Sequence, residues 1–195
     1  MPLVADDSAY QPPPRKLSPA VGLLLAAGGC GLIVLVGGVS LLTLLQTEQQ
    51  RHAAALQASR CLSNGKQVAM GVLMYSQDYD ERLPPAATWS REVFPYVKNS
   101  AVYVCPAAPD LLNGYGMNAR ADRLALKDVS QPALAPLLFE SGSGTGGGDP
   151  LTSFVTRHPG ANGNRAWVSY VDGHVKWATS APPADQGLKK TRPRR

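Results

Sequence analysis

Residues 157–177, RHPGANGNRAWVSYVDGHVKW, decide the fold of this chain. Two apolar runs within them flank Asp172 and Gly173. An Asp-Gly pair in this setting is the strongest short-range signal of a β-hairpin, because a two-residue type I′ turn needs positive φ at both positions. The stretch therefore predicts two antiparallel strands that close a small sheet.

A two-residue turn also predicts which side chains share a face of this hairpin. Side chains opposite each other across the turn alternate between the two faces. The predicted core face pairs Tyr170 with Val175 and Val168 with Trp177, and the predicted polar face pairs Val171 with His174 and Ser169 with Lys176. His174 should then point away from the core, and we interpret Asp172, Gly173 and His174 as a signature of the fold.

A divalent-metal site is the alternative interpretation of the same region. Glu140, His158, Asp172 and His174 would offer carboxylate and imidazole ligands from two strands and a turn. Their spacing does not form a compact ligand motif, and His158 in a Gly/Asn-rich loop is expected at the surface. No nucleophile with a base and an orienting group is evident, so we expect no catalytic residues, no enzyme and no firm cofactor.

Residues 17–45 contain no charged side chain. The run is longer than the roughly 20 residues that cross a bilayer, which predicts a transmembrane helix, with a secretory signal peptide as the alternative. Arg15 and Lys16 precede the span, and this charge bias favours an N-terminus in the cytoplasm. We therefore expect a disordered cytoplasmic leader over residues 1–16 and a single-pass protein of the cytoplasmic membrane.

Residues 46–179 should then form an extracytoplasmic domain. Cys61 and Cys105 both fall in it, where a disulfide can persist, so we expect these two cysteines to be bridged. Two unpaired, buried thiols are the alternative. Residues 46–79 contain no proline and carry a periodic apolar pattern, which predicts a helix that continues the membrane span. Short segments separated by Pro and Gly follow. Three of them predict strands of a sheet, residues 101–106 (AVYVCP), 133–140 (ALAPLLFE) and 153–158 (SFVTRH), and residues 113–118 (NGYGMN) predict a turn.

The net charge of +5 comes from the end of the chain. Residues 189–195, KKTRPRR, hold five of the 19 Lys and Arg residues, which leaves 14 bases against 14 acids before them. Residues 180–195 are expected to be a disordered, basic and solvated tail. The chain shows no basic patch interleaved with aromatic residues, so we expect no nucleic-acid partner.

The sequence resembles bacterial prepilin-like proteins, related to type II secretion pseudopilins, that carry a C-terminal processing-associated domain named for His-x9-Asp-Gly. The resemblance spans about residues 58–178 and rests on several motifs in order: RCLSNGKQVAMGVLMYSQDYDERLPP, PYVKNSAVYVCP, YGMN, LLFE and VDGHVKW. It implies an α+β, pilin-like fold, in which a long N-terminal transmembrane-plus-soluble helix packs on a small antiparallel β-sheet. A Cys61–Cys105 bridge tying helix to sheet is consistent with this fold.

Two features depart from the family pattern. Thirteen residues, rather than nine, separate His158 from Asp172. Prepilins also carry a Gly at the cleavage site, then Phe, and a Glu at the fifth position, whereas LSPAVG follows Lys16 here. We expect that the chain is not processed as a prepilin and stays anchored.

The expected function is a membrane-anchored structural or assembly protein that acts through protein–protein contacts, in a type II secretion or type IV pilus-like system. Its partners would be membrane lipid and other envelope or pilin-like proteins. A stripe of mostly small residues (Gly22, Ala26, Cys30, Val34 and Gly38) suggests helix–helix self-association, although such spacing also arises by chance. The alternatives are an extracytoplasmic metal- or ligand-binding module along His174, Lys176 and Trp167, and, less favoured, a metal-dependent hydrolase.

Overall fold

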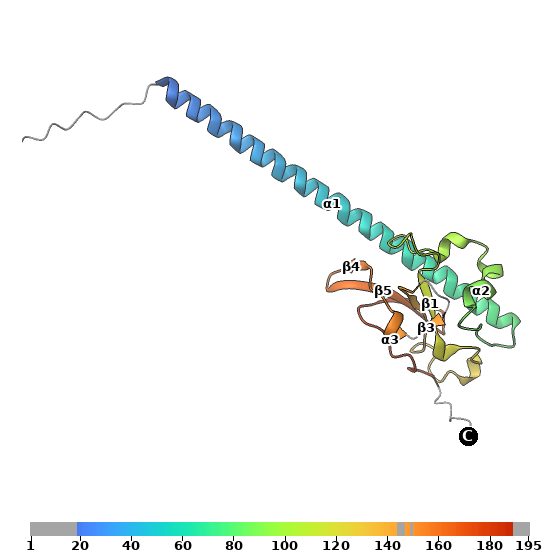
Figure 1. Cartoon of the computed structure of the whole chain (residues 1–195). Coiled ribbons are helices and arrows are strands. Elements are labelled where there is room, and N and C mark those ends of the chain that lie inside the picture. The colour runs from blue at the N-terminus through green and yellow to red at the C-terminus, as the bar shows by residue number, and fades with distance from the viewer. Residues whose placement is uncertain (1–18, 144–146, 149, 189–195) are drawn as a thin grey trace, which may run out of the picture. The chain divides into compact units, whose positions relative to one another are not determined.

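Helix α1 (Pro19–Asp78) is the longest element that the structure describes (Figure 1). The computed structural model describes residues 19–143, 147–148 and 150–188, with side chains for all of these except 19–35, 147, 148, 150 and 151. The chain divides into two units, residues 1–49 and 50–195, and α1 belongs to both. The expected leader, residues 1–16, and the basic end of the tail, residues 189–195, lie outside the described residues.

The described side chains of the first unit are exposed. The large apolar ones among them are Val36, Val39, Leu41, Leu42, Leu44 and Leu45. Over the residues that the structure describes, no helix combines the length and the apolar character that a membrane crossing requires. Most of the expected span, residues 17–45, precedes the first described side chain, so the span stays a prediction, as does the small-residue stripe from Gly22 to Gly38.

In the second unit, α1 buries one face. The buried positions recur every three or four residues, as expected for an amphipathic helix that packs on one side: Ala58, Cys61, Gly65, Val68, Ala69, Gly71, Val72, Tyr75 and Ser76. The predicted helix over residues 46–79 is therefore confirmed, and it ends at Asp78.

Two glycines bring neighbouring elements close to this face. A Cβ on Gly65 would lie 2.7 Å from Cε2 of Trp167, and a Cβ on Gly71 would lie 2.6 Å from Cγ2 of Val97. Both distances are too short for real Cβ contacts, so only glycine admits Trp167 and helix α2 (Trp89–Val97) at their present distances. The cost of glycine in a helix, about 1 kcal/mol against alanine, is offset by this packing.

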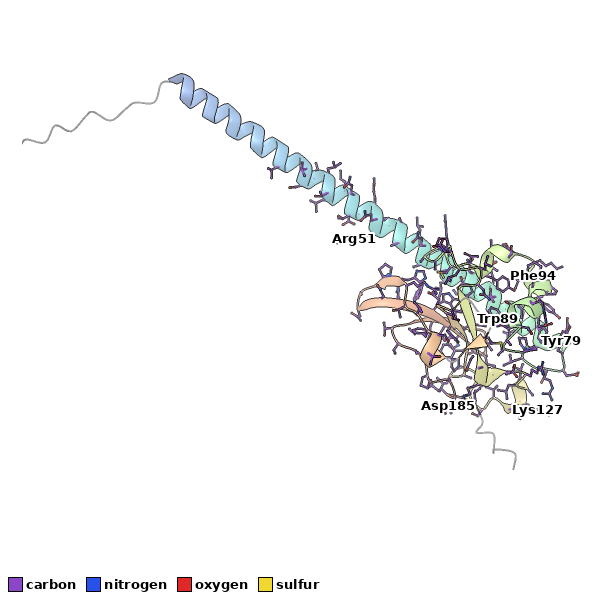
Figure 2. All side chains as sticks on the ribbon, viewed as in Figure 1. Arg51, Tyr79, Trp89, Phe94, Lys127 and Asp185 are labelled. Atoms are coloured by element: carbon purple, nitrogen blue, oxygen red, sulfur yellow. The ribbon has the colours of Figure 1, made fainter. Side chains whose placement is uncertain are left out.

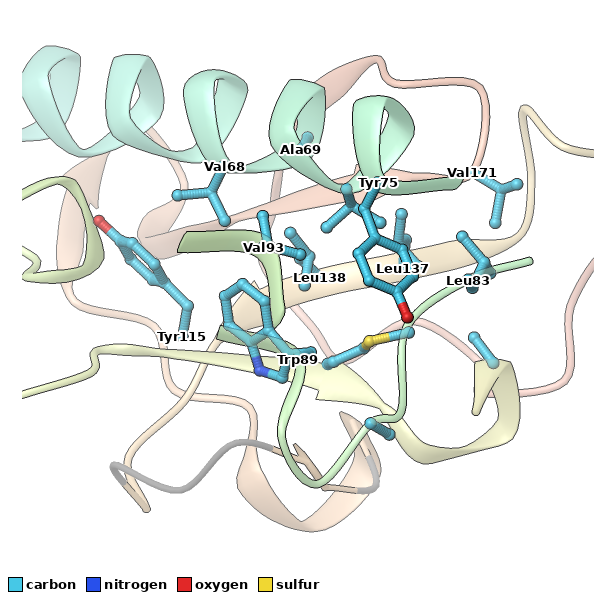
Figure 3. Packing of buried hydrophobic residues seen from close by; sticks show 14 of the residues in the cluster. Val68, Ala69, Tyr75, Leu83, Trp89, Val93, Tyr115, Leu137, Leu138 and Val171 are labelled. Carbon is cyan, nitrogen blue, oxygen red and sulfur yellow. The ribbon is translucent and has the colours of Figure 1, made fainter. Parts of the chain in front are cut away.

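A small sheet covers the buried face of α1 (Figure 3). Its strand order is β3-β1-β2-β5-β4, with β6 also paired to β5, and its pairs are antiparallel except for the short β1–β3 pair. The strands are β1 (Tyr115–Asn118), β2 (Pro136–Glu140), β3 (Gly147–Gly148), β4 (His158–Gly160), β5 (Gly163–Tyr170) and β6 (Val175–Ala178). An α+β architecture with a long helix packed on a small antiparallel sheet is thus confirmed.

The core lies between α1 and the sheet (Figure 3). Trp89 and Trp167 are the largest fully buried side chains, and Figure 2 shows Trp89 within the second unit, whereas Tyr79 and Phe94 are exposed. A register shift between Pro136 and Leu138 interrupts the alternation of β2, and both Leu137 and Leu138 belong to this core. A smaller cluster contains Phe139, Val168 and Tyr170.

The β5–β6 hairpin forms as predicted, but the predicted register is wrong by one residue. Ser169 pairs with Val175, and Trp167 pairs with Trp177, so a three-residue loop joins the strands in place of a two-residue turn. Gly173 alone in this loop takes positive φ, at +90°. The reason is Val171, which is 4% exposed in the main core and would have faced the polar side in the predicted pairing.

Several shorter elements differ from their predicted type. Residues around Val102, predicted as a strand, form the 3-10 helix η1 (Ser100–Tyr103), and the predicted turn at YGMN is strand β1. The other described elements are η2 (Ala119–Ala121), η3 (Leu126–Asp128) and α3 (Pro150–Ser153). Strand β1 pairs with β2 and β3, so backbone pairing across the sheet determines its type.

The first part of the expected disordered tail is ordered. Asn118 Nδ2 donates a hydrogen bond to the Ala184 carbonyl over 2.8 Å, and the amides of Ser130 and Gln131 donate to the Gly187 carbonyl over 2.9 and 3.0 Å. Leu188 packs against the main core. The expectation of disorder from residue 180 is therefore wrong for residues 180–188, because their backbone finds partners in the domain.

Candidate functional site: a buried cluster of two cysteines, a glutamate and a histidine

Four side chains from four segments meet beneath α1. Cys61 comes from the buried face of α1, Cys105 from the segment after η1, Glu140 from the end of β2 and His158 from the start of β4. One potential ligand atom of each lies within 4.8 Å of those of the other three. All four residues are at most 1% exposed. We call them the Cys61–Cys105–Glu140–His158 cluster.

The polar atoms of the cluster contact one another directly. Cys61 Sγ lies 2.9 Å from Cys105 Sγ and 3.5 Å from Glu140 Oε1. His158 Nε2 lies 3.1 Å from Glu140 Oε1 and 3.5 Å from Cys105 Sγ. The four atoms thus form a closed ring of contacts in an interior from which water is largely excluded.

Neighbouring groups hold the cluster in place. Tyr115 Oη lies 3.4 Å from Cys61 Sγ, and the Trp167 amide donates to Glu140 Oε1 over 3.3 Å. Arg157 lies with its guanidinium 3.7 Å from Glu140 Oε2, and it donates to the carbonyls of Gly114 and Ser141. Each polar neighbour is therefore fixed by an element of the sheet or its connections.

The environment shifts the pKa of each member. Burial raises the pKa of the Glu140 carboxyl, although its hydrogen bond with His158 acts in the opposite direction. Burial lowers the pKa of His158, but the hydrogen bonds with Cys105 and Glu140 outweigh it and raise the pKa to about 9. The hydrogen bond between the sulfurs raises the pKa of Cys61 and lowers that of Cys105.

The expected bridge between Cys61 and Cys105 stays a prediction. The structure brings the two sulfurs together, but both residues are free cysteines at 2.9 Å. A disulfide bond is about 2.05 Å long. The arrangement therefore fits either of two states, a bridge after oxidation or two sulfurs that share another partner.

The structure divides the expected metal-ligand set into two pairs. Glu140 and His158 meet in the cluster, and the expected surface position of His158 is wrong. Asp172 and His174 instead contact each other in the hairpin loop, with His174 Nδ1 2.6 Å from Asp172 Oδ1, and both are more than a third exposed. They fix the loop, because Asp172 also accepts a hydrogen bond from the His174 amide.

No protein-family model, curated protein or solved structure matches this chain.

The expected ligand-binding face along His174, Lys176 and Trp167 does not form. Trp167 is fully buried against α1. His174 stacks on the Tyr170 ring with 4.4 Å between ring centroids, and Lys176 Nζ lies 4.5 Å from the centroid of the same ring. Both side chains therefore pack on a tyrosine of the smaller cluster, away from the tryptophan.

Two of the hollows in the described surface have volumes of about 290 and 270 Å³. The first is lined by residues of α2, η1 and the segment after it, among them Phe94 and Tyr103. The second is lined by Tyr75 of α1, by residues of the segment after this helix and by Arg123. Neither is lined by a member of the Cys61–Cys105–Glu140–His158 cluster. The cluster is thus an interior site.

Proposed function

We propose that this protein is a membrane-anchored, pseudopilin-like assembly protein that acts through protein–protein contacts outside the cytoplasm, in a type II secretion or type IV pilus-like system. The observation that carries the proposal is the two-part character of α1. Its C-terminal part buries one face against the sheet, whereas residues 36–45 expose apolar side chains. A helix that is apolar all round needs lipid or neighbouring helices to cover it.

The division of α1 supports an assembly role. In the second unit the sheet covers one face of the helix, whereas the described side chains of α1 in the first unit are exposed. Within a bilayer, helices associate side by side through van der Waals packing and interhelical hydrogen bonds, so this uncovered part of α1 can join neighbouring helices. The resemblance in sequence to prepilin-like proteins, over about residues 58–178, points to the same role.

Site-specific photocrosslinking in the native envelope tests this proposal. A photoreactive residue at Leu42 of the full chain should crosslink to envelope proteins or to a second copy of the chain, and the protein should sediment with the membrane fraction. The matched control places the same residue at Leu112, which is exposed on the domain. Recovery of the full chain in the soluble fraction, without crosslinks from Leu42, would contradict the proposal.

The protein's topology supplies a second readout of the same proposal. Protease added to intact spheroplasts should cleave in residues 50–195 while the envelope still excludes it from cytoplasmic proteins. Full protection of this region would contradict the extracytoplasmic location.

The alternative function, a metal- or ligand-binding module, is favoured by one observation, the buried cluster.

A further inference from the structure

We propose that Cys61, Cys105, Glu140 and His158 together bind one zinc ion, which joins α1 to the sheet. The proposal goes beyond the assembly function and is independent of it. Two thiolate sulfurs, one imidazole nitrogen and one carboxylate oxygen are all ligand types that zinc takes in proteins. Four protein ligands make a closed, structural site, and the burial of all four matches this.

The distances in the cluster approach those of a tetrahedral site. Typical Zn–S, Zn–N and Zn–O bonds correspond to edges of about 3.5 Å between sulfur and nitrogen or oxygen and about 3.4 Å between nitrogen and oxygen. The observed edges are 3.5 Å for Cys61–Glu140, 3.5 Å for Cys105–His158 and 3.1 Å for His158–Glu140. The sulfur–sulfur edge, at 2.9 Å, would open to about 3.8 Å, and the His158–Glu140 edge, at 3.1 Å, to about 3.4 Å. The two remaining edges lie within 4.8 Å, against about 3.5 Å in a tetrahedral site.

The charges around the cluster balance when zinc is present. Zn²⁺ with two thiolates, one carboxylate and a neutral imidazole carries a net charge of −1. The Arg157 guanidinium, 9% exposed and 3.7 Å from Glu140 Oε2, supplies the compensating +1. Binding would release the thiol and imidazolium protons to solvent, as metal binding to such ligands generally does. A buried site without net charge avoids the desolvation cost of an uncompensated ion.

Glu140 Oε2 is buried and accepts no hydrogen bond from any described residue, and its ion-pair partner Arg157 lies 3.7 Å away. A buried carboxylate oxygen without a hydrogen bond is destabilising. A cation at the cluster would add a direct interaction with this carboxylate.

A disulfide between Cys61 and Cys105 does not account for the other two members. The bridge would occupy both sulfurs and would leave Glu140 and His158 as a buried pair, 3.1 Å apart, that shares no partner with the sulfurs. Zinc uses all four residues at once. The two states exclude each other, because the same sulfurs cannot both be bonded together and ligate the metal as thiolates.

Metal analysis of the full chain tests the proposal. The chain, extracted in detergent from its own membranes without reductant, should carry one zinc ion per chain by native mass spectrometry and elemental analysis, and lose it on acid denaturation. After replacement by Co²⁺, thiolate-to-cobalt charge-transfer bands and the visible spectrum of a tetrahedral ion should appear.

Matched substitutions assign the ligands. Glu140→Gln and His158→Gln keep side-chain size and should weaken zinc affinity by roughly 100-fold or more, beyond the 10–100-fold typical of supporting residues. His174→Gln, at the exposed histidine, should leave affinity unchanged. Near-ultraviolet circular dichroism reports whether each variant is folded, and a folded Glu140→Gln chain with unchanged zinc affinity would overturn the proposal.

The oxidation state of Cys61 and Cys105 is a second readout that can overturn the proposal. A chain isolated from its membranes with Cys61 disulfide-bonded to Cys105 and without zinc would also overturn the proposal and would confirm the predicted bridge. A reduced, folded chain that takes up no added Zn²⁺ would overturn it as well. Neither result bears on the membrane-anchored assembly function, whose crosslinking test uses a different part of the chain.

Discussion

Tyr103 is buried with a hydroxyl group that has no partner. Its side chain is 6% exposed within the main core and contacts Trp89, with 5.7 Å between ring centroids, yet its Oη accepts and donates no hydrogen bond among the described residues. An unpaired buried hydroxyl costs free energy that a hydrogen atom in its place would not. Replacing Tyr103 with phenylalanine therefore measures the effect of the unpaired hydroxyl on stability while the aromatic ring stays in place.

We predict that Tyr103→Phe raises the free energy of unfolding of the second unit by about 1 kcal/mol at neutral pH, because the ring stays and the unpaired group leaves. Burial raises the pKa of Tyr103 from its ordinary 10.0 to about 12. A raised pKa in the folded state means that stability is retained below pH 10 and lost as pH rises towards 12. The phenylalanine variant should lose less stability over this range.

Denaturant titrations of the full chain in detergent at neutral pH and at several alkaline values would measure both effects. Tyr79→Phe, at an exposed tyrosine, is the matched control and should change neither. A lower unfolding midpoint for Tyr103→Phe at neutral pH would show that the hydroxyl has a partner that stabilises the fold.

Elements that depend on local periodicity could be predicted from the sequence, and elements that depend on remote pairing could not. The buried positions of α1 repeat every three or four residues, so its presence and its end near Asp78 follow from the pattern. Strand β1 is buried at all four positions and therefore shows no alternation. Its partners, β2 and β3, lie about 20 to 30 residues further along the chain and cannot be read from its own four residues.

The contact between the hairpin loop and α1 yields a prediction about glycine. Gly173 has φ of +90°, and a Cβ there would lie 2.7 Å from Leu73 Cδ1. Gly163, in the β4–β5 turn, has φ of +101° but nothing within 4 Å. We expect Gly163→Ala to destabilise by about 1 kcal/mol from backbone strain alone, and Gly173→Ala by about 0.5–1.5 kcal/mol more, because the Leu73 side chain must shift from its rotamer to admit the new Cβ.

The difference between the two variants, measured by thermal or denaturant unfolding, isolates the contact between hairpin and helix. Shortening Leu73 to alanine in the Gly173→Ala background should recover part of the loss, because it removes the atom that the new Cβ meets. Equal destabilisation by both substitutions would mean that the Leu73 contact contributes nothing.

The four members of the candidate site could not be predicted from the sequence as one cluster. Its members, Cys61, Cys105, Glu140 and His158, are spread over almost 100 residues, and no short motif joins them. Glu140 and His158 are candidate metal ligands from their residue types alone. The two cysteines predict a disulfide with each other, because a pair outside the cytoplasm favours a bridge over a metal site. Only the folded chain brings the two thiols, the carboxylate and the imidazole together in one buried cluster.

For the molecule as a whole, we predict that the chain is not cleaved between Lys16 and the apolar run that follows it. Prepilins are cut at a Gly that this chain lacks after Lys16, so the segment that precedes residue 17 should remain attached. Protein isolated from its own membranes and digested with a protease that does not cleave after Lys or Arg should yield a peptide that spans Lys16 and Leu17. Installing the missing signal, as Leu17→Gly, Ser18→Phe and Gly22→Glu, should make the chain a substrate and remove that peptide.

A mature N-terminus within residues 17–23 in the unaltered chain would contradict the prediction and would make the protein a processed pilin. The distinction changes how the assembly works. A processed chain is free to leave the bilayer and enter a filament, whereas an unprocessed chain with Arg15 and Lys16 still attached keeps two positive charges on the cytoplasmic side, which resist transfer through the membrane core. The predicted retention of these charges therefore favours a fixed, membrane-anchored component over a filament subunit.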